Sequence, residues 1–210
     1  MSDRIIDMPV IQFLDDLASS KPAPGGGSVS ALAGSLGAGL ISMVCSLTVG
    51  KKKYADVQDD IQNLLGRSEK LRAELEGLIE EDIKVYTELN TTMKMPRETD
   101  EEKAARNAAM DTALKAATGV PLKIAEVCVS VMDLCPEAAE KGNSNAVSDV
   151  GVGILMAEAG LRSAALNVLI NLGYLKDETF IQETRKKLDE LLKGRPEMRD
   201  QIYDLVVSQL

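Results

Sequence analysis

An acidic residue lies on the apolar face of the longest helical pattern in the chain. Between residues 54 and 92 apolar side chains recur in alternating steps of four and three, and only Ser68 and Asp82 interrupt the series. A carboxylate on such a face costs desolvation free energy unless it has a partner or a chemical task. Asp82 is therefore either half of a buried salt bridge or a carboxylate lining a cavity. In the second case, a shifted pKa would suit general acid–base catalysis.

A glycine run opens a second apolar helix. Gly25, Gly26 and Gly27 precede Ser28, which we expect to be the N-cap of a helix ending near Gly50. Backbone amides at a helix start attract anionic or carbonyl groups. The run is not a Walker loop, because no Gly-Lys-Ser/Thr follows it. It is either a ligand-binding turn or a flexible turn that permits close packing of helices.

Three consecutive lysines, Lys51, Lys52 and Lys53, follow the same helix. Cations are favoured at a helix C-terminus, so a solvated helix end explains them. An anion-binding edge in an otherwise acidic protein is the alternative, and the lysine run by itself favours the solvated helix end.

A further polar cluster surrounds residues 142–149. Asn143 or Ser144 is expected to cap the helix that follows, and Asp149 lies in its first turn, where the helix dipole favours an anion. Asp149 is a weaker candidate for chemistry than Asp82. Glu158 and Arg162, four residues apart on that helix, predict an ion pair.

The composition excludes several classes of function. The 210 residues carry a net charge of −9, and aromatic residues make up 3% of the chain. Binding to nucleic-acid phosphates or stacking on single-stranded bases is therefore disfavoured. The chain has no His, which excludes Ser-His-Asp triads, Cys-His pairs and His-based zinc sites. Catalysis must use carboxylates, lysines, hydroxyls or a thiol.

The cysteines and the chain start predict a cytoplasmic protein. Cys45, Cys128 and Cys135 form no CxxC pair and are expected to be reduced core thiols. The first residues lack the pattern of a signal peptide. Residues 22–50 are uncharged and long enough to span a membrane, but they are rich in Ser, Gly and Ala. We interpret them as a buried helix of a soluble protein, with no membrane contact.

The elements that position these residues are all helical. We expect one all-α domain over 1–210, a bundle with a long central helix and two buried helices rich in Gly and Ala. Thr99 and Glu102 form a capping box for a fourth helix, which is expected to break or kink at Gly119–Pro121. Asp177 and Pro196 open two amphipathic helices that cover the surface. The other helices are predicted at 9–19, 28–50, 54–92, a fifth ending near 135, and 146–171.

Four segments together resemble the cyclodeaminase/cyclohydrolase family of folate enzymes. They are Pro-Ala-Pro-Gly-Gly-Gly-Ser at 22–28, Thr-Val-Gly-Lys-Lys-Lys-Tyr at 48–54, Gly-Asn-Ser-Asn-Ala-Val-Ser-Asp at 142–149 and Ala-Ala-Leu-Asn-Val-Leu-Ile-Asn-Leu at 164–172. The likeness extends over about residues 5–195. It implies a helical homodimer with tetrahydrofolate substrates bound in a cleft.

The resemblance also implies roles for single residues. The family's acidic catalytic residue lies in the pattern Leu-Ile/Val-x-x-Asp-x-x-x-Tyr/Phe, which residues 78–86 match with Asp82. Lys52 and Lys53 match the family's basic pair. The resemblance thus implies that the catalytic residues are Asp82, Lys52 and Lys53, and that the substrate-binding residues are Pro24, Gly25, Gly26, Gly27, Ser28, Lys51, Tyr86, Asn143 and Asp149.

Two reactions fit the family. A methenyltetrahydrofolate cyclohydrolase adds water to the methenyl carbon and gives 10-formyltetrahydrofolate, and Asp82 would act as base and then acid. A formimidoyltetrahydrofolate cyclodeaminase closes the same ring and expels ammonia. The separate chain, and its likeness to stand-alone cyclohydrolases at 49–54 and 160–168, favour the cyclohydrolase. Neither reaction needs a metal or a cofactor beyond the folate substrate. A non-catalytic helical dimer that binds folate or a protein partner is the alternative outside enzymes.

Overall fold

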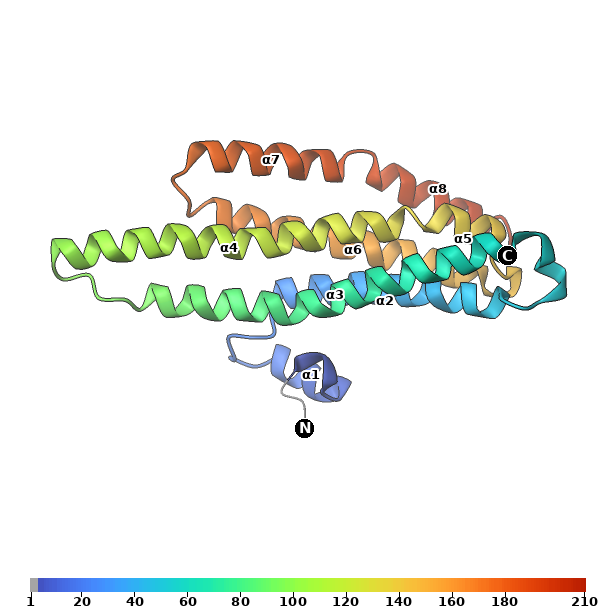
Figure 1. Ribbon diagram of the computed structural model, residues 1–210, viewed down its shortest axis with the longest axis horizontal. Helices are drawn as coiled ribbons and strands as arrows, with labels where there is room; N and C mark the ends of the chain where they lie inside the picture. The colour runs from blue at the N-terminus through green and yellow to red at the C-terminus, as the bar shows by residue number, and fades with distance from the viewer. Residues whose placement is uncertain (1–3) are drawn as a thin grey trace.

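The computed structural model describes residues 4–210, and every regular element in that range is a helix. Four long helices, α2, α3, α4 and α6, run side by side, and α7 and α8 lie along one flank (Figure 1). The all-helical class expected from the sequence is confirmed for these residues. In chain order the elements are η1 (Ile5–Asp7), α1 (Val10–Leu17), α2 (Gly26–Thr48), η2 (Lys52–Val57), α3 (Gln58–Met93), α4 (Asp100–Met132), α5 (Cys135–Lys141), η3 (Ser144–Ala146), α6 (Val147–Leu172), α7 (Glu178–Leu192) and α8 (Arg195–Val207).

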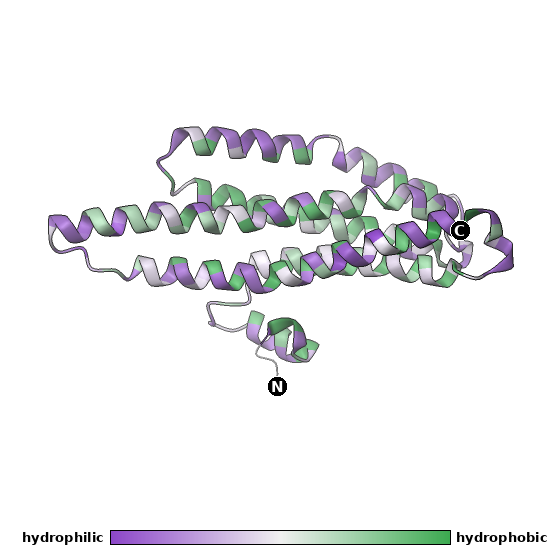
Figure 2. Cartoon of the chain, viewed as in Figure 1, coloured by the Kyte–Doolittle hydropathy of each residue, from purple (hydrophilic) through white to green (hydrophobic). Residues whose placement is uncertain are grey.

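Small residues bring the α2 and α6 backbones into contact. A Cβ atom on Gly160 would lie 2.8 Å from the carbonyl oxygen of Ser30, and one on Gly37 would lie 2.8 Å from that of Gly153. Real Cβ atoms do not approach a backbone so closely, so a larger residue would push the helices apart. Figure 2 shows the hydrophobic character of α6 against the mostly hydrophilic α7. The two Gly/Ala-rich helices pack against each other through many buried residues.

Two helical segments, Gly26–Thr48 and Ser144–Leu172, are long and apolar enough to cross a membrane by length and composition. Within them, 61% and 50% of the most apolar window is buried inside the bundle. A core helix of a soluble protein has the same properties. The absence of membrane contact stays a prediction.

The apolar stripe of α3 faces the core. Ile61, Leu64, Leu75, Leu78 and Leu89 are buried. Ser68, one of its two polar interruptions, is fully buried; its hydroxyl donates to the Ala38 carbonyl at 2.7 Å and accepts from the Ser42 hydroxyl at 2.9 Å. Its polarity is thus satisfied within the core, and it needs no functional explanation.

The break predicted at Gly119–Pro121 is wrong, because α4 continues to Met132 with Pro121 inside it. Proline has no N–H group to reach the carbonyl four residues back, which belongs to Ala117. The side-chain amide of Asn171 on α6 donates to that carbonyl at 2.8 Å. A neighbouring helix therefore supplies the missing donor.

The predicted helix ends are mostly confirmed. Thr99 and Glu102 form the capping box of α4, and Asp177 accepts from the Phe180 amide at the start of α7. The prediction for Ser28 is wrong. The N-cap is Gly25, three residues earlier, so Ser28 lies in the first turn of α2 and its hydroxyl donates to Asp82 of α3.

The cysteines are confirmed as free and buried. Burial raises the pKa of the Cys45 thiol to about 11 and those of Cys128 and Cys135 to about 12. These thiols are therefore protonated at neutral pH and unsuited to nucleophilic catalysis.

The predicted ion pair between Glu158 and Arg162 has an N–O distance of 3.6 Å. Arg199 of α8 approaches the other carboxylate oxygen of Glu158, also at 3.6 Å. Glu158 is only 7% exposed. The pair is thus part of the contact between α6 and α8.

Candidate functional site

Asp82 lies against the first turn of α2. A Cβ atom on Gly27 would lie 2.5 Å from Cγ of Asp82 and would overlap its carboxylate. The Ser28 hydroxyl donates to Oδ2 of Asp82 at 2.9 Å. The absence of a side chain at Gly27 thus allows the Asp82 carboxylate to contact the start of α2.

The surroundings of Asp82 favour a protonatable carboxylate. Burial raises the pKa of Asp82, while hydrogen bonds from the hydroxyl and backbone amide of Ser28 act in the opposite direction. No Lys or Arg within residues 4–210 forms a salt bridge with it. The buried salt bridge considered for Asp82 is therefore not formed in the described part of the chain.

Asp82 borders two adjoining hollows. One, of about 240 Å³, is bounded by the glycine loop, and the other, of about 350 Å³, by apolar side chains of α3, α4 and α6. Three residues line both hollows: Asp82, Tyr86 and Asn167. We call these two hollows the Asp82 cleft. It combines apolar walls, a half-buried acid and a helix N-terminus, as small-molecule sites commonly do.

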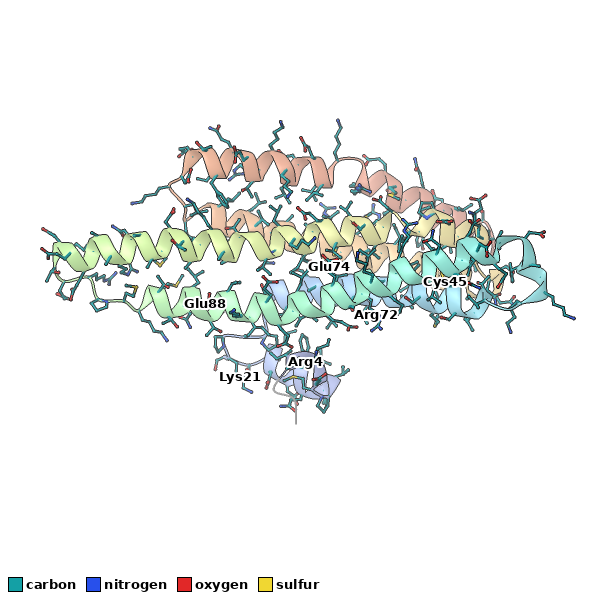
Figure 3. The ribbon with its side chains drawn as sticks, in the orientation of Figure 1. Arg4, Lys21, Cys45, Arg72, Glu74 and Glu88 are labelled. Carbon is teal, nitrogen blue, oxygen red and sulfur yellow. The ribbon has the colours of Figure 1, made fainter. Side chains whose placement is uncertain are left out.

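The lysines lie at the opposite end of α2. That helix has 23 residues, so about 33 Å separates its ends. Gly50, with φ of +73°, turns the chain into the lysine run. In Figure 1 this turn is at the far right, whereas the glycine loop enters α2 near the middle. Figure 3 labels Lys21 beside the glycine loop and Cys45 near the other end of α2.

The lysine end is a polar cluster of its own. Lys53 Nζ donates to the Ser144 hydroxyl at 3.0 Å, and the Tyr54 hydroxyl accepts from the Ser144 amide at 2.9 Å. Asn143 donates through its backbone amide to Thr48 Oγ1 at 2.8 Å and through its side-chain amide to the Leu47 carbonyl at 2.9 Å. Asn143 therefore ties this turn to the end of α2. We call Lys51, Lys52, Lys53, Asn143 and Ser144 the lysine cluster.

Within one chain, the predicted site residues thus divide into two groups. The Asp82 cleft contains Gly25, Gly26, Gly27, Asp82 and Tyr86, with Ser28 beneath it and Pro24 buried rather than lining it. The lysine cluster contains the second group, and Asp149 lies beyond it in the first turn of α6. Asp82 and the lysines do not share one cleft within a single chain.

Sequence reasoning missed Asn167. Its side chain lies beside the glycine loop, where a Cβ atom on Gly26 would be 3.2 Å from its Oδ1. Residues 164–172 carry part of the family resemblance. The signal in the sequence that could have identified Asn167 is a side-chain amide among apolar helix residues. No spacing rule linked that amide to Asp82, because the two residues are far apart in sequence.

No group of three His, Cys, Asp or Glu side chains is placed to hold a metal ion within residues 4–210. The absence of a metal or cofactor requirement stays a prediction.

The sequence pattern of the formiminotransferase-cyclodeaminase family matches residues 9–190. The chain belongs to this family. The match covers both the Asp82 cleft and the lysine cluster, so the family shares the segments that build them.

Relatives in the family carry two different names. The methenyltetrahydrofolate cyclohydrolase of Methylorubrum extorquens is 49% identical over 94% of this chain and 95% of its own length. The formimidoyltransferase-cyclodeaminase of Rattus norvegicus is 32% identical over 90% of this chain, which corresponds to 35% of that longer protein. The crystal structure of formiminotetrahydrofolate cyclodeaminase from Thermotoga maritima superposes with a TM-score of 0.79, at 29% identity, over 97% of this chain and 96% of that one.

Proposed function

We propose that this protein is a methenyltetrahydrofolate cyclohydrolase that uses Asp82 as its general base and acid. The 49% identity to a cyclohydrolase, over nearly the full length of both chains, carries the choice of reaction. The half-buried carboxylate in the Asp82 cleft, with its raised pKa, supports the choice of catalytic residue.

Asp82 takes part in two proton transfers of the proposed reaction. Asp82 takes a proton from water as the water oxygen bonds to the methenyl carbon, and an electron pair of the amidinium group moves to nitrogen. The neutral adduct then opens: the bond from carbon to N5 breaks, and Asp82 returns the proton to N5. The adduct's hydroxyl proton leaves to solvent as the formyl C=O forms. One carboxylate serves both steps, and a pKa raised towards neutrality suits that exchange.

We propose that the lysine cluster acts on the Asp82 cleft of a second subunit. Each α2 helix carries the glycine loop at one end and the lysines at the other. In a two-fold symmetric dimer, an antiparallel pairing of α2 helices brings the lysines of one subunit beside the glycine loop of its partner, twice. The lysines would then hold the anionic tail of folate or stabilise a developing negative charge.

The exposed surface of α2 and α6 supports this pairing. These adjacent helices leave large apolar side chains in solvent, among them Leu36 and Met43 on α2 and Val152, Leu166 and Ile170 on α6. Exposed large apolar side chains on two adjacent helices are typical of a protein interface. We expect the dimer to bury well over the roughly 1,600 Å² of a standard interface.

Cyclodeaminase activity is the second candidate. The Thermotoga maritima protein, whose structure covers nearly all of this chain, is named a cyclodeaminase. In that reaction Asp82 would protonate the departing ammonia. The same folate scaffold binds in both cases, so the site geometry fits either.

Two assays test the proposal. Purified protein is added to methenyltetrahydrofolate in a weakly catalysing buffer and the loss of methenyl absorbance is followed. Ammonia release from formimidoyltetrahydrofolate is measured in parallel. We expect acceleration of the first reaction. Acceleration of ammonia release alone would identify a cyclodeaminase, and no acceleration of either would identify a non-catalytic folate-binding dimer. A cytoplasmic location stays a prediction.

A further inference from the structure

The side-chain nitrogen of Asn167 has a hydrogen-bond partner within the described residues, whereas its side-chain oxygen has none. Its Nδ2 donates to the Ser163 carbonyl, one turn back on α6, at 2.8 Å. A carbonyl oxygen only accepts, so the nitrogen must face Ser163, which fixes the orientation of the amide. Its Oδ1 accepts no hydrogen bond from any group in the described range 4–210.

The free oxygen belongs to a side chain that lines the same cleft as Asp82. The glycine pair at the start of α2 leaves room for two polar side chains: Asp82 fills the space at Gly27, and Asn167 the space at Gly26. The two side chains come from α3 and α6 and border both hollows of the Asp82 cleft. An acceptor oxygen and a half-buried base therefore line the same two hollows, beside consecutive glycines.

We infer that Asn167 positions the water molecule that attacks the methenyl carbon, an inference that rests on the proposed cyclohydrolase function. A water molecule has two protons and two lone pairs. One proton goes to Asp82 as the bond from the water oxygen to the methenyl carbon forms. The second O–H group of the water donates a hydrogen bond to Asn167 Oδ1. A lone pair then remains for the methenyl carbon. Asn167 forms no bond to substrate and loses no proton.

Positioning of water by Asn167 predicts different effects on turnover and on folate binding when Asn167 is removed. If Asn167 orients water, its removal slows the chemical step and leaves folate affinity almost unchanged, because misplaced reactants lower the rate more than the binding. If Asn167 instead held an N–H group of the pterin ring, its removal would raise KM and the dissociation constant together.

The experiment compares Asn167→Ala and Asn167→Asp with the parent. Asn107→Ala is the control, because Asn107 is exposed on α4, outside the site. For each folded variant, kcat, KM and the dissociation constant for 10-formyltetrahydrofolate are measured. We expect Asn167→Ala to lower kcat by about 10- to 100-fold, with KM and the dissociation constant changed less than about threefold.

Asn167→Asp gives a second, independent readout. It keeps an acceptor oxygen but adds a negative charge beside Asp82, which raises the pKa of Asp82. We expect the acidic limb of the pH–rate profile to move to higher pH. Residue 167 lying too far from Asp82 to share a water molecule with it would leave that limb in place.

The outcomes separate the two claims. A parent protein that does not hydrolyse methenyltetrahydrofolate overturns the proposed function. A parent that does, with parental kcat in Asn167→Ala or an unmoved acidic limb in Asn167→Asp, overturns the role of Asn167 alone.

Discussion

At the scale of the residue, the site depends on how Asp82 is solvated. Its carboxylate has lost water on the core face of α3, and Ser28 compensates for only part of that loss. The Asp82 position followed from the periodicity of the sequence, because a single acid among Leu and Val residues is visible there. Its partners did not, since Gly27, Ser28 and Asn167 reach it from two other helices.

Gly27→Ala tests the close approach of the glycine loop to Asp82. The new methyl group would overlap the carboxylate, so we expect Asp82 to be displaced and turnover to fall by at least about tenfold. Gly77→Ala is the matched control: Gly77 lies on the same helix as Asp82, with nothing within 4 Å of an added Cβ. It should keep parental turnover and gain up to about 1 kcal/mol of stability from helix propensity. Equal turnover in the two variants would contradict the packing described for Asp82.

The raised pKa of Asp82 predicts opposite pH trends for activity and stability. A protonated carboxyl group cannot accept a proton, so turnover should fall as pH drops through the raised pKa. Ionisation is harder in the folded than in the unfolded state. The stability contribution of Asp82 is therefore greatest below its unfolded-state pKa, and is lost as pH rises to the folded-state value. Melting temperatures of the parent and Asp82→Asn across this range should diverge in favour of Asn as pH rises; a gap in favour of the parent would contradict the burial argument.

At the scale of the element, the helices were largely predictable from the sequence, but the contacts between helices were not. Apolar periodicity and caps located α3, α4 and α7, since both signals are local. The continuity of α4 through Pro121 depends on Asn171, a residue of another helix, and no local signal reveals it. The separation of the lysine cluster from Asp82 also required the packing of α2 against α3.

Asn171→Ala tests this account of α4. It leaves the Ala117 carbonyl without its donor, so we expect a loss of about 1–3 kcal/mol in the free energy of unfolding. Pro121→Ala restores a backbone N–H group to that carbonyl. In the Pro121→Ala background, Asn171→Ala should therefore cost clearly less in a denaturation experiment. Equal losses in both backgrounds would show that Asn171 does not compensate for the proline.

At the scale of the whole molecule, charge and surface both favour a dimer. The chain carries a net charge of −9, while a folate monoglutamate adds two tail carboxylates, so local positive charge must offset a repulsive far field. In one chain the lysine cluster is about 33 Å from the glycine loop, estimated from the 23 residues of α2. The exposed apolar residues of α2 and α6 would cover one another in the antiparallel dimer.

Complementation tests the shared site. Asp82→Asn and the Lys52→Ala/Lys53→Ala double variant should each form an inactive or weakly active dimer of about 45 kDa, twice the 22.6 kDa chain. Mixed dimers would hold one site with both Asp82 and the lysines. Random exchange of subunits should therefore restore up to about a quarter of parental turnover. A 23 kDa monomer in light scattering, or no recovery after exchange is verified, would contradict the shared site.

The turnover of Asp82→Asn on methenyltetrahydrofolate tests the central claim most directly. The substitution keeps the shape of the side chain and removes its ability to take up and return a proton. We expect turnover to fall by at least about 100-fold, in a folded dimer that still binds folate and has an unchanged or raised melting temperature. Near-parental turnover in this variant would contradict the assignment of Asp82 as the general base and acid.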